Sequence, residues 1–299
     1  MSDEGTIRGA YDGSSVAFRA LEAWGWGEFV NLGFYPLLAL PGLLFGMAPF
    51  QRRLAARAVD LLAPGPGERV LDAGCGRGGA SALVAARGAE VLGVDLLPES
   101  IAAAQARFGA DPRLRFAVAD VTRLPARAAG VDLSAGCFDA VLCLEAGFHL
   151  GAKGRRAFLE EAARVLRPGG RLVLVDFAWR DSRPERIAEL DRDRLVRDTW
   201  RFAEFEPLER YRASLRELGF VERAFRDWTG PVTDRFQHIA TFLARTGNTR
   251  AGRAFWCALR PRLARIPPHE WATLVPLMRA HDEVRRASRY VAFLLEKPA

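Results

Sequence analysis

Arg69-Val-Leu-Asp-Ala-Gly-Cys-Gly-Arg-Gly-Gly79 is the stretch of sequence that decides the fold. An apolar run ends at Asp72, glycines follow at alternate positions, and the alanine-rich segment 80–87 predicts a helix. A strand, a glycine-rich turn and a helix in this order open a doubly wound α/β sheet, which binds nucleotide-like ligands beyond the ends of its strands. Glycine permits the tight turn and lets the backbone come close to such a ligand.

The same alternation of strand and helix continues to residue 176. Short apolar runs predict strands at 70–72, 91–95, 114–118, 140–144 and 172–176. Helical patterns occupy 80–87, 99–108 and 155–166. Strands separated by helices indicate a parallel sheet with helices on both faces.

The glycine-rich loop and the positions after it together resemble the class I S-adenosylmethionine-dependent methyltransferases. Asp72 stands two residues before the first glycine, Asp95 ends the second strand, and Asp120 follows the third. The segment Arg164-Val-Leu-Arg-Pro-Gly-Gly170, before the last of these strands, is also similar. The resemblance covers residues 62–176. It implies a seven-stranded Rossmann-like methyltransferase sheet of the small-molecule branch, which includes specialised-metabolite and ubiquinone-type enzymes.

The resemblance also implies a cofactor, S-adenosyl-L-methionine, which leaves as S-adenosyl-L-homocysteine. It assigns Asp72 to the loop and the methionine amine, Asp95 to the ribose hydroxyls, and Asp120 to the adenine amino group. The other expected cofactor contacts are Gly74, Cys75, Gly76, Leu96, Val121 and Leu144. Glu145 is expected near the methionine end, or else as an acid that orients an arginine or a backbone group.

His149, in Leu144-Glu-Ala-Gly-Phe-His-Leu150, is the expected general base. The segment resembles the stretch that many small-molecule methyltransferases place beside the reactive methyl group. Imidazole titrates near neutral pH, which suits a base, and a histidine that only shapes the pocket is the alternative. Tyr11 is the second catalytic candidate, since phosphoethanolamine-type relatives close a tyrosine–histidine latch over the cofactor. Tyr35 is its rival for that place.

Two helical covers are predicted outside the core. We expect an N-terminal lid at 1–62, the cofactor-binding core at 63–228, a helical cap insertion at 229–286 and the final strand of the core sheet at 287–299. The uncharged run 29–50 is long enough to cross a bilayer, but its prolines and glycines break a continuous helix, so we expect no stable membrane insertion. Trp24 and Trp26 are the tryptophans preferred for substrate contact.

Charge and cysteine content narrow the class of partner. The formal net charge is +7 and comes from arginines that are interleaved with acids along the sequence. This pattern does not form the basic cluster expected of a nucleic-acid-binding surface. The [ND]-P-P-[YF] stretch of DNA amino-methyltransferases is also missing. The four cysteines have no metal-ligand spacing, so we expect no metal site and a reduced, cytoplasmic protein. The expected partner is a small hydrophobic substrate and not a nucleic acid, with a homodimer left open.

The resemblance implies methyl transfer to a small, largely apolar acceptor, with a hydroxyl oxygen of a specialised metabolite as the preferred site. Carbon methylation of a prenyl, quinone or sterol-like substrate is one alternative, in which Glu145 and the lid aromatics would matter more. A cyclase with the methyltransferase fold, which keeps the cofactor as a structural part, is another.

Overall fold

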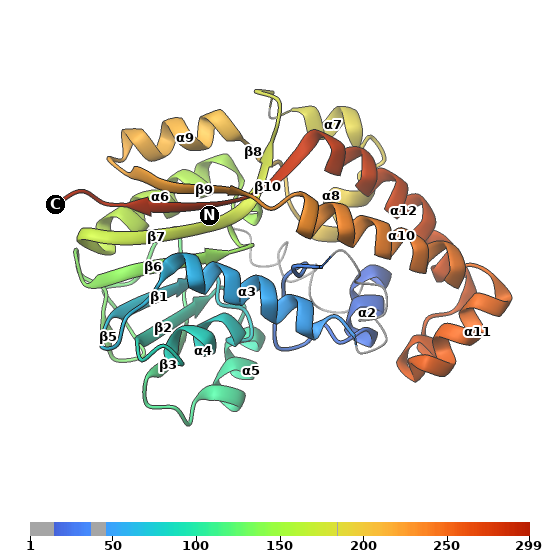
Figure 1. Cartoon of the computed structure of the whole chain (residues 1–299), viewed down its shortest axis with the longest axis horizontal. Helices are drawn as coiled ribbons and strands as arrows, with labels where there is room; N and C mark the ends of the chain where they lie inside the picture. Colours follow the sequence, from blue (N-terminus) through green and yellow to red (C-terminus); the bar gives the residue numbers. More distant parts are fainter. Residues whose placement is uncertain (1–14, 37–45, 184) are drawn as a thin grey trace.

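The computed structural model describes residues 15–36, 46–183 and 185–299, which build one central sheet with helices around it (Figure 1). Five parallel strands run in the order β3 (Leu114–Val118), β2 (Glu90–Asp95), β1 (Arg69–Ala73), β6 (Phe138–Leu144) and β7 (Leu166–Trp179). The sheet continues with two antiparallel strands, β10 (Ser288–Glu296) beside β7 and β9 (Val221–Asp227) beside β10. The doubly wound seven-stranded α/β sheet is therefore confirmed.

Three further strands are very short. The two-residue β8 (Glu206–Pro207) pairs with one end of β7 and adds an eighth strand to the sheet. β4 (Arg127–Ala128) and β5 (Val131–Asp132) pair with each other outside it.

Helices cover both faces of the sheet. One face carries α3 (Ala48–Leu62), α4 (Gly79–Ala85) and α5 (Pro98–Phe108), and the other carries α6 (Gly151–Val165) and α9 (Leu208–Glu217). Two hydrophobic cores result, because successive side chains of a strand point to opposite faces. On β10, Tyr290 and Ala292 belong to the first core, whereas Val291 and Phe293 belong to the second.

The remaining helices lie beside the edge of the sheet where β2 and β6 end (Figure 1). They are α2 (Val16–Ala23), α7 (Arg186–Leu190), α8 (Leu195–Trp200), α10 (Arg235–Gly247), α11 (Arg250–Leu259) and α12 (Pro268–Ala287). The short turns η2 (Gly147–His149), η3 (Gly230–Asp234) and η4 (Pro261–Arg265) connect elements of this region. α10 packs along α12, and α11 lies at the outer end, far from the sheet.

Three boundaries depend on local backbone contacts. α3 begins at Ala48, because the first turn of a helix tolerates Pro49. The charged segment 185–205 holds two short helices, α7 and α8. β7 begins at Leu166, before the expected strand at 172–176, since the backbone of its Pro-Gly-Gly part exchanges hydrogen bonds with Lys297. None of the described helices combines the length and apolar character needed to cross a membrane.

Candidate functional site

Glycine shapes the loop that follows β1. Gly74 has a φ of +78°, and a Cβ added to it would lie 2.4 Å from the Cβ of Ala146. The N–H groups of Gly74 and Cys75 both donate to the carbonyl oxygen of Val94, at 2.9 and 3.0 Å. The loops after β1 and β6 and the end of β2 are therefore packed closely, and a side chain at position 74 would force them apart.

These loops surround a pocket, which we call the strand-end pocket. It spans about 1160 Å³, including the open space at its mouth. Among the residues selected from the sequence, its lining includes Gly74, Gly76, Asp95, Leu96, Asp120, Val121, Leu144, Glu145 and His149. The sheet brings them together because neighbouring parallel strands end at the same edge.

Other lining residues were missed from the sequence. They include Leu97, Glu99, Ser100 and Ala103, which lie at the start of α5 directly after Asp95. Their position gives a usable signal, since the first turns of the helix that follows a strand face the same edge as the strand end. Val30, from the N-terminal segment, also lines the pocket, and no local pattern indicated it.

Asp95 is held from behind by the backbone. Its Oδ2 accepts from the N–H of Gly76 and its Oδ1 from the N–H of Leu97, both at 2.9 Å. Burial raises the pKa of the Asp95 carboxyl, and these hydrogen bonds oppose the rise. Each oxygen keeps a second lone-pair direction, so the carboxylate can accept two further hydrogen bonds from a pair of hydroxyl groups.

Asp120 lies just after the end of β3. Its Oδ1 accepts from the backbone N–H and the hydroxyl of Thr122, at 2.9 and 2.7 Å. This local turn fixes the carboxylate beside Leu96 and Val121, which also line the strand-end pocket. Together, the Asp120 carboxylate can accept a hydrogen bond from an amino group, and the two apolar side chains can pack against the faces of a flat heterocycle.

Asp72 and Cys75 lie behind the loop and are not among the residues that line the pocket. The Asp72 carboxylate accepts from the Ser81 hydroxyl at 2.6 Å, and burial raises its pKa to about 6. The Cys75 sulfur packs against Gly93, 3.0 Å from the place a Cβ would take there. Both side chains therefore support the loop from inside the core. Of Cys75, only the backbone can contact a ligand in the pocket.

The N-terminal segment covers the strand-end pocket. Arg77 donates to the carbonyl oxygen of Gly27 at 3.1 Å, and the ring of Phe29 lies against Gly79. Leu32 donates its N–H to the Glu145 carboxylate at 3.2 Å. Residues before α3 are thus attached to the loops after both β1 and β6.

Glu145 joins this pocket to a second one. A φ of +55° turns its backbone at the end of β6, and its Oε1 accepts from the Tyr290 hydroxyl at 2.6 Å. Burial raises the pKa of the Glu145 carboxyl to about 7, against the hydrogen bonds from Tyr290 and Leu32. Glu145 and Val30 line both the strand-end pocket and its neighbour.

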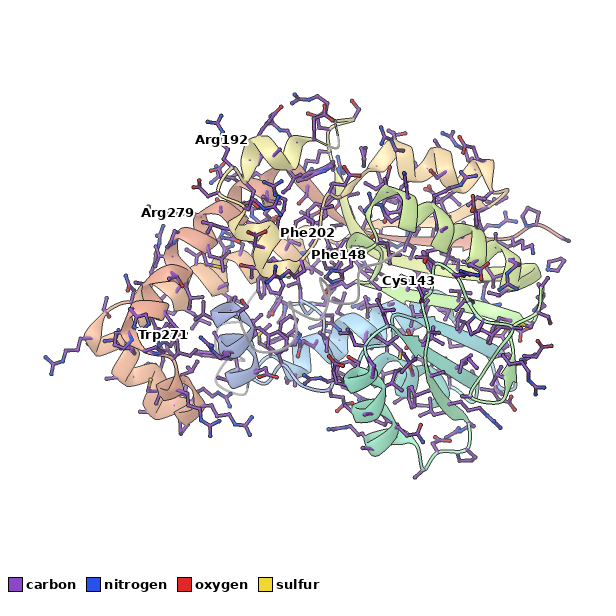
Figure 2. The ribbon with its side chains drawn as sticks, turned by 180° about the vertical axis from the view of Figure 1, so that it is seen from behind. Cys143, Phe148, Arg192, Phe202, Trp271 and Arg279 are labelled. Atoms are coloured by element: carbon purple, nitrogen blue, oxygen red, sulfur yellow. The ribbon has the colours of Figure 1, made fainter. Side chains whose placement is uncertain are left out.

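The neighbouring pocket, called here the aromatic pocket, is walled by six large rings: Trp26, Phe148, Phe177, Trp200, Phe202 and Phe205. Phe202 and Phe205 stack with centroids 4.5 Å apart, and Phe148 meets Phe202 edge to face at 5.9 Å. Figure 2 shows Phe148 and Phe202 close together between the sheet and the outer helices. The rings suit an apolar or aromatic ligand, and the polar part of the lining comes from Glu145, Thr233, His281, Arg285 and Ser288.

Glu145→Gln should remove a pH dependence of stability. The folded pKa of about 7 exceeds the ordinary value of 4.5. Ionisation of Glu145 therefore destabilises the folded state. This destabilisation is absent below pH 4.5 and is complete well above pH 7. Near pH 8 the variant should be more stable by about 3 kcal/mol, and the gap should shrink towards pH 5. Urea unfolding from pH 5 to pH 8 measures the free energy of unfolding of the native protein and the variant, with the exposed Glu90→Gln as the control.

If the unfolding free energies of the native protein and Glu145→Gln changed with pH in parallel, the expectation would be refuted.

His149 lies on η2 and lines the strand-end pocket. Its Nδ1 is 3.2 Å from the carbonyl oxygen of Arg201, and its ring is tilted by 34° against that of Phe148, with centroids 3.9 Å apart. A carbonyl accepts only, so Nδ1 carries the proton and Nε2 has the basic lone pair. Burial lowers the pKa of His149 to about 4, which keeps the imidazole neutral at pH 7.

Tyr35 and the buried Asp176 take different places. Tyr11 lies outside the described residues. Tyr35 is buried, donates its hydroxyl to the carbonyl oxygen of Leu32 at 2.7 Å and does not line the strand-end pocket. Asp176 accepts from the hydroxyl of Tyr211, and burial raises the pKa of its carboxyl to about 6. Within the described ranges, no group of three or more His, Cys, Asp and Glu side chains is placed to hold a metal ion.

The donor set fits the cofactor that the glycine loop implies. Asp95 suits the two hydroxyls of a ribose, Asp120 with Leu96 and Val121 suits an adenine, and the Glu145 carboxylate suits a nearby positive charge. S-Adenosylmethionine carries all three features.

The chain is similar to several known proteins. Residues 70–170 match the family described as a methyltransferase domain. The 2-methyl-6-phytyl-1,4-hydroquinone methyltransferase of Synechocystis sp. is 33% identical over 243 residues, which cover 76% of this chain and 72% of that protein. A probable chloroplastic tocopherol O-methyltransferase of Oryza sativa subsp. japonica is 28% identical over 271 residues, covering 85% and 70%.

A solved structure shares the fold over nearly its whole length. The geranyl diphosphate C-methyltransferase from Streptomyces coelicolor A3(2), in complex with S-adenosyl-L-homocysteine among other ligands, superposes with a TM-score of 0.70. The match covers 98% of this chain and 97% of that one at 18% identity, a likeness of fold alone. From the family match, the Synechocystis relative and this fold, the chain belongs to the class I S-adenosylmethionine-dependent methyltransferases that act on small molecules, and S-adenosylmethionine is its cofactor.

Proposed function

We propose that the enzyme methylates a hydroxyl oxygen of a small, largely apolar acceptor that sits in the aromatic pocket. The observation that carries the proposal is the shared wall, since Glu145 and Val30 line both the strand-end pocket and the aromatic pocket. A cofactor in the first pocket and an acceptor in the second would meet there. Closure by the N-terminal segment would exclude water and align the acceptor for in-line attack.

In this proposal, different residues of the strand-end pocket bind different parts of the cofactor. Asp95 binds the ribose hydroxyls, Asp120 the adenine amino group, and Leu96 and Val121 the two faces of the base. Gly74, Gly76 and Leu144 border the methionine part, with Asp72 and Cys75 supporting the loop. The cofactor supplies an electrophilic methyl group on a positively charged sulfur. All further steps depend on the residues of this chain.

His149 is the proposed base. Its Nε2 would take the proton of the acceptor hydroxyl as the oxygen attacks, while the Arg201 carbonyl holds Nδ1–H and stabilises the imidazolium that forms. The low pKa keeps His149 ready to accept a proton at neutral pH but makes it a weak base. An acidic hydroxyl, such as that of a phenol or hydroquinone, therefore suits it better than an alkyl alcohol. The Oryza relative, named as an O-methyltransferase, supports the oxygen acceptor.

A carbon acceptor is the second candidate, and the aromatic pocket favours it. Ring faces stabilise a developing carbocation, and the Glu145 carboxylate at the shared wall would take up the proton that the methylated carbon loses. Its pKa of about 7 is suited to proton transfer at neutral pH. The two candidates thus differ in the base, His149 for oxygen and Glu145 for carbon.

The acceptor also has room for a hydrocarbon tail. A third cavity, called here the apolar chamber, spans about 650 Å³ among α2, α10 and α12, including the open space at its mouth. Trp200 lines both the chamber and the aromatic pocket, and its buried Nε1 has no hydrogen-bond partner among the described residues. We propose that lid 1–62 and cap 229–286 act as units that hold the acceptor against core 63–228, which residues 287–299 complete.

Ala240→Trp should fill the apolar chamber. Ala240 lies on its wall, and loss of room for about three methylene groups should lower kcat/KM for tailed acceptors about 50-fold. Acceptors without a tail should react as before. The measurement is a tail-length series, with the exposed Ala106→Trp as the matched control. Equal losses for short and long acceptors would place the tail elsewhere.

Incubation with S-adenosylmethionine labelled with ¹³C at the methyl group tests the function. A panel of phenols, hydroquinones and prenyl compounds provides the acceptors, and mass spectrometry with carbon NMR identifies the product. A methyl carbon bound to oxygen supports the first candidate, and one bound to carbon supports the second. A rearranged product without added methyl would refute both in favour of cyclase chemistry.

A further inference from the structure

The positive charge of the chain is concentrated in one part of the cap. Residues 235–269 contain seven arginines and no aspartate or glutamate, while the rest of the chain has equal numbers of basic and acidic residues. The whole net charge of +7 therefore belongs to these 35 residues. The arginines are not scattered evenly, contrary to the expectation from the sequence. The segment corresponds to α10, α11 and η4, at the outer end of the molecule (Figure 1).

Three of these arginines take no part in internal ion pairs among the described residues. Arg250, Arg262 and Arg265 are exposed and form no salt bridge with any residue in the described ranges. Two arginines, Arg250 and Arg253, stand in the first turn and a half of α11, where positive charge opposes the helix dipole. Local stability does not account for this placement, and such a departure from the local rule is typical of a functional surface.

Large apolar side chains are exposed among these arginines. Phe255 on α11 is 57% exposed and Phe242 on α10 is 47% exposed. Both rings meet Trp256 edge to face, with centroids 4.8 and 6.1 Å away. Trp256 in turn meets Trp24, which lines the apolar chamber, at 5.4 Å. A row of aromatic rings therefore runs from the surface to the chamber.

The two sides of α10 support the same arrangement. Ile239, Ala240 and Leu243 line the apolar chamber on one side. Phe242 and Arg245 line a groove on the other side, together with Arg279 of α12. Arg245 and Arg279 also form no salt bridge within the described ranges. Figure 2 shows Arg279 on the outer part of the cap.

We propose that this surface, formed by α10, α11 and η4, docks the enzyme onto an anionic lipid bilayer. Exposed phenylalanines flanked by arginines are the composition of a segment that lies in a membrane interface, with rings at the acyl boundary and guanidinium groups at the anionic head groups. The charge complements an anionic surface, and the exposed rings distinguish a bilayer from a nucleic acid backbone. Docking would bring the apolar chamber beside the hydrocarbon layer. The inference stands on charge and exposure and does not depend on which atom is methylated.

Vesicle sedimentation tests the proposal with the full chain. The protein should bind vesicles of phosphatidylcholine mixed with phosphatidylglycerol, bind phosphatidylcholine alone weakly, and dissociate as salt is raised. Each arginine at an anionic surface strengthens binding about fivefold, so Arg250→Gln with Arg262→Gln should weaken it about 25-fold. Arg123→Gln with Arg127→Gln changes the net charge equally on the exposed surface of the core and should leave binding intact.

The aromatic part is tested separately. Phe242→Ser with Phe255→Ser should weaken vesicle binding about tenfold or more, and both exposed sites tolerate serine in the fold. Unchanged S-adenosylmethionine affinity by calorimetry shows that each variant is folded. The proposal is overturned if anionic vesicles are not bound, or if the core control loses as much as the cap variant. Binding of a DNA duplex that depends on the cap arginines, without any dependence on the phenylalanines, would assign the surface to nucleic acid instead.

Discussion

Replacing His149 with alanine should lower the turnover number about 10²- to 10⁴-fold, the usual contribution of a positioned general base. S-Adenosylmethionine affinity should stay nearly unchanged, because the proposed cofactor contacts come from Asp95, Asp120 and the glycine loop. Burial lowers the pKa of His149 to about 4. The rate of the native enzyme should therefore fall on acidification only near that pH, well below the 6.5 of an ordinary histidine.

Chemical rescue separates a base from a residue that only shapes the pocket. Added imidazole should restore part of the turnover of His149→Ala, while the methyl-transfer product stays the same. His238→Ala, at an exposed position on α10, is the matched control and should behave as the native enzyme. Near-normal turnover in His149→Ala would remove the base assignment. Under the carbon-acceptor mechanism, Glu145→Gln would show the large loss instead.

The cofactor side of the site was largely predictable from the sequence, since it depends on short-range patterns. A strand that ends in a carboxylate and meets a glycine turn places both at the edge of a parallel sheet. Asp95 ends β2 and Asp120 follows β3, yet the strand order puts both residues in one pocket. The same reasoning could not distinguish residues that line the pocket from residues that support the loop. Asp72 and Cys75 were predicted to contact the cofactor, but their side chains are buried behind the loop.

The acceptor side was not predictable in the same way. The rings of the aromatic pocket come from Phe148 after β6, Phe177 on β7, Trp200 on α8 and Phe205 before β8. These positions share no periodicity, and only tertiary packing brings them together. Tryptophans chosen from the lid did fall on cavity walls, Trp24 in the apolar chamber and Trp26 in the aromatic pocket. Trp200 lines both cavities, and apart from its large side chain no feature of the sequence predicts this position.

Asp95→Ala should weaken S-adenosylmethionine binding about 100-fold or more, because two hydrogen bonds to a charged acceptor contribute about 1.5–3 kcal/mol each. The carboxylate also accepts from Gly76 and Leu97, so a loss of affinity alone would not distinguish ribose binding from loop support. A ligand change resolves this, since the contact with ribose hydroxyls requires those hydroxyls.

Calorimetry with adenosine and 2′,3′-dideoxyadenosine completes a thermodynamic cycle with the native enzyme and Asp95→Ala. If Asp95 binds the ribose, the native enzyme should prefer adenosine strongly, and the variant should bind the two nucleosides almost equally. If Asp95 only supports the loop, the variant should bind both more weakly and keep the native preference between them. That second result would move the ribose away from the end of β2, and Glu99, which also lines the pocket, would be the next residue to replace.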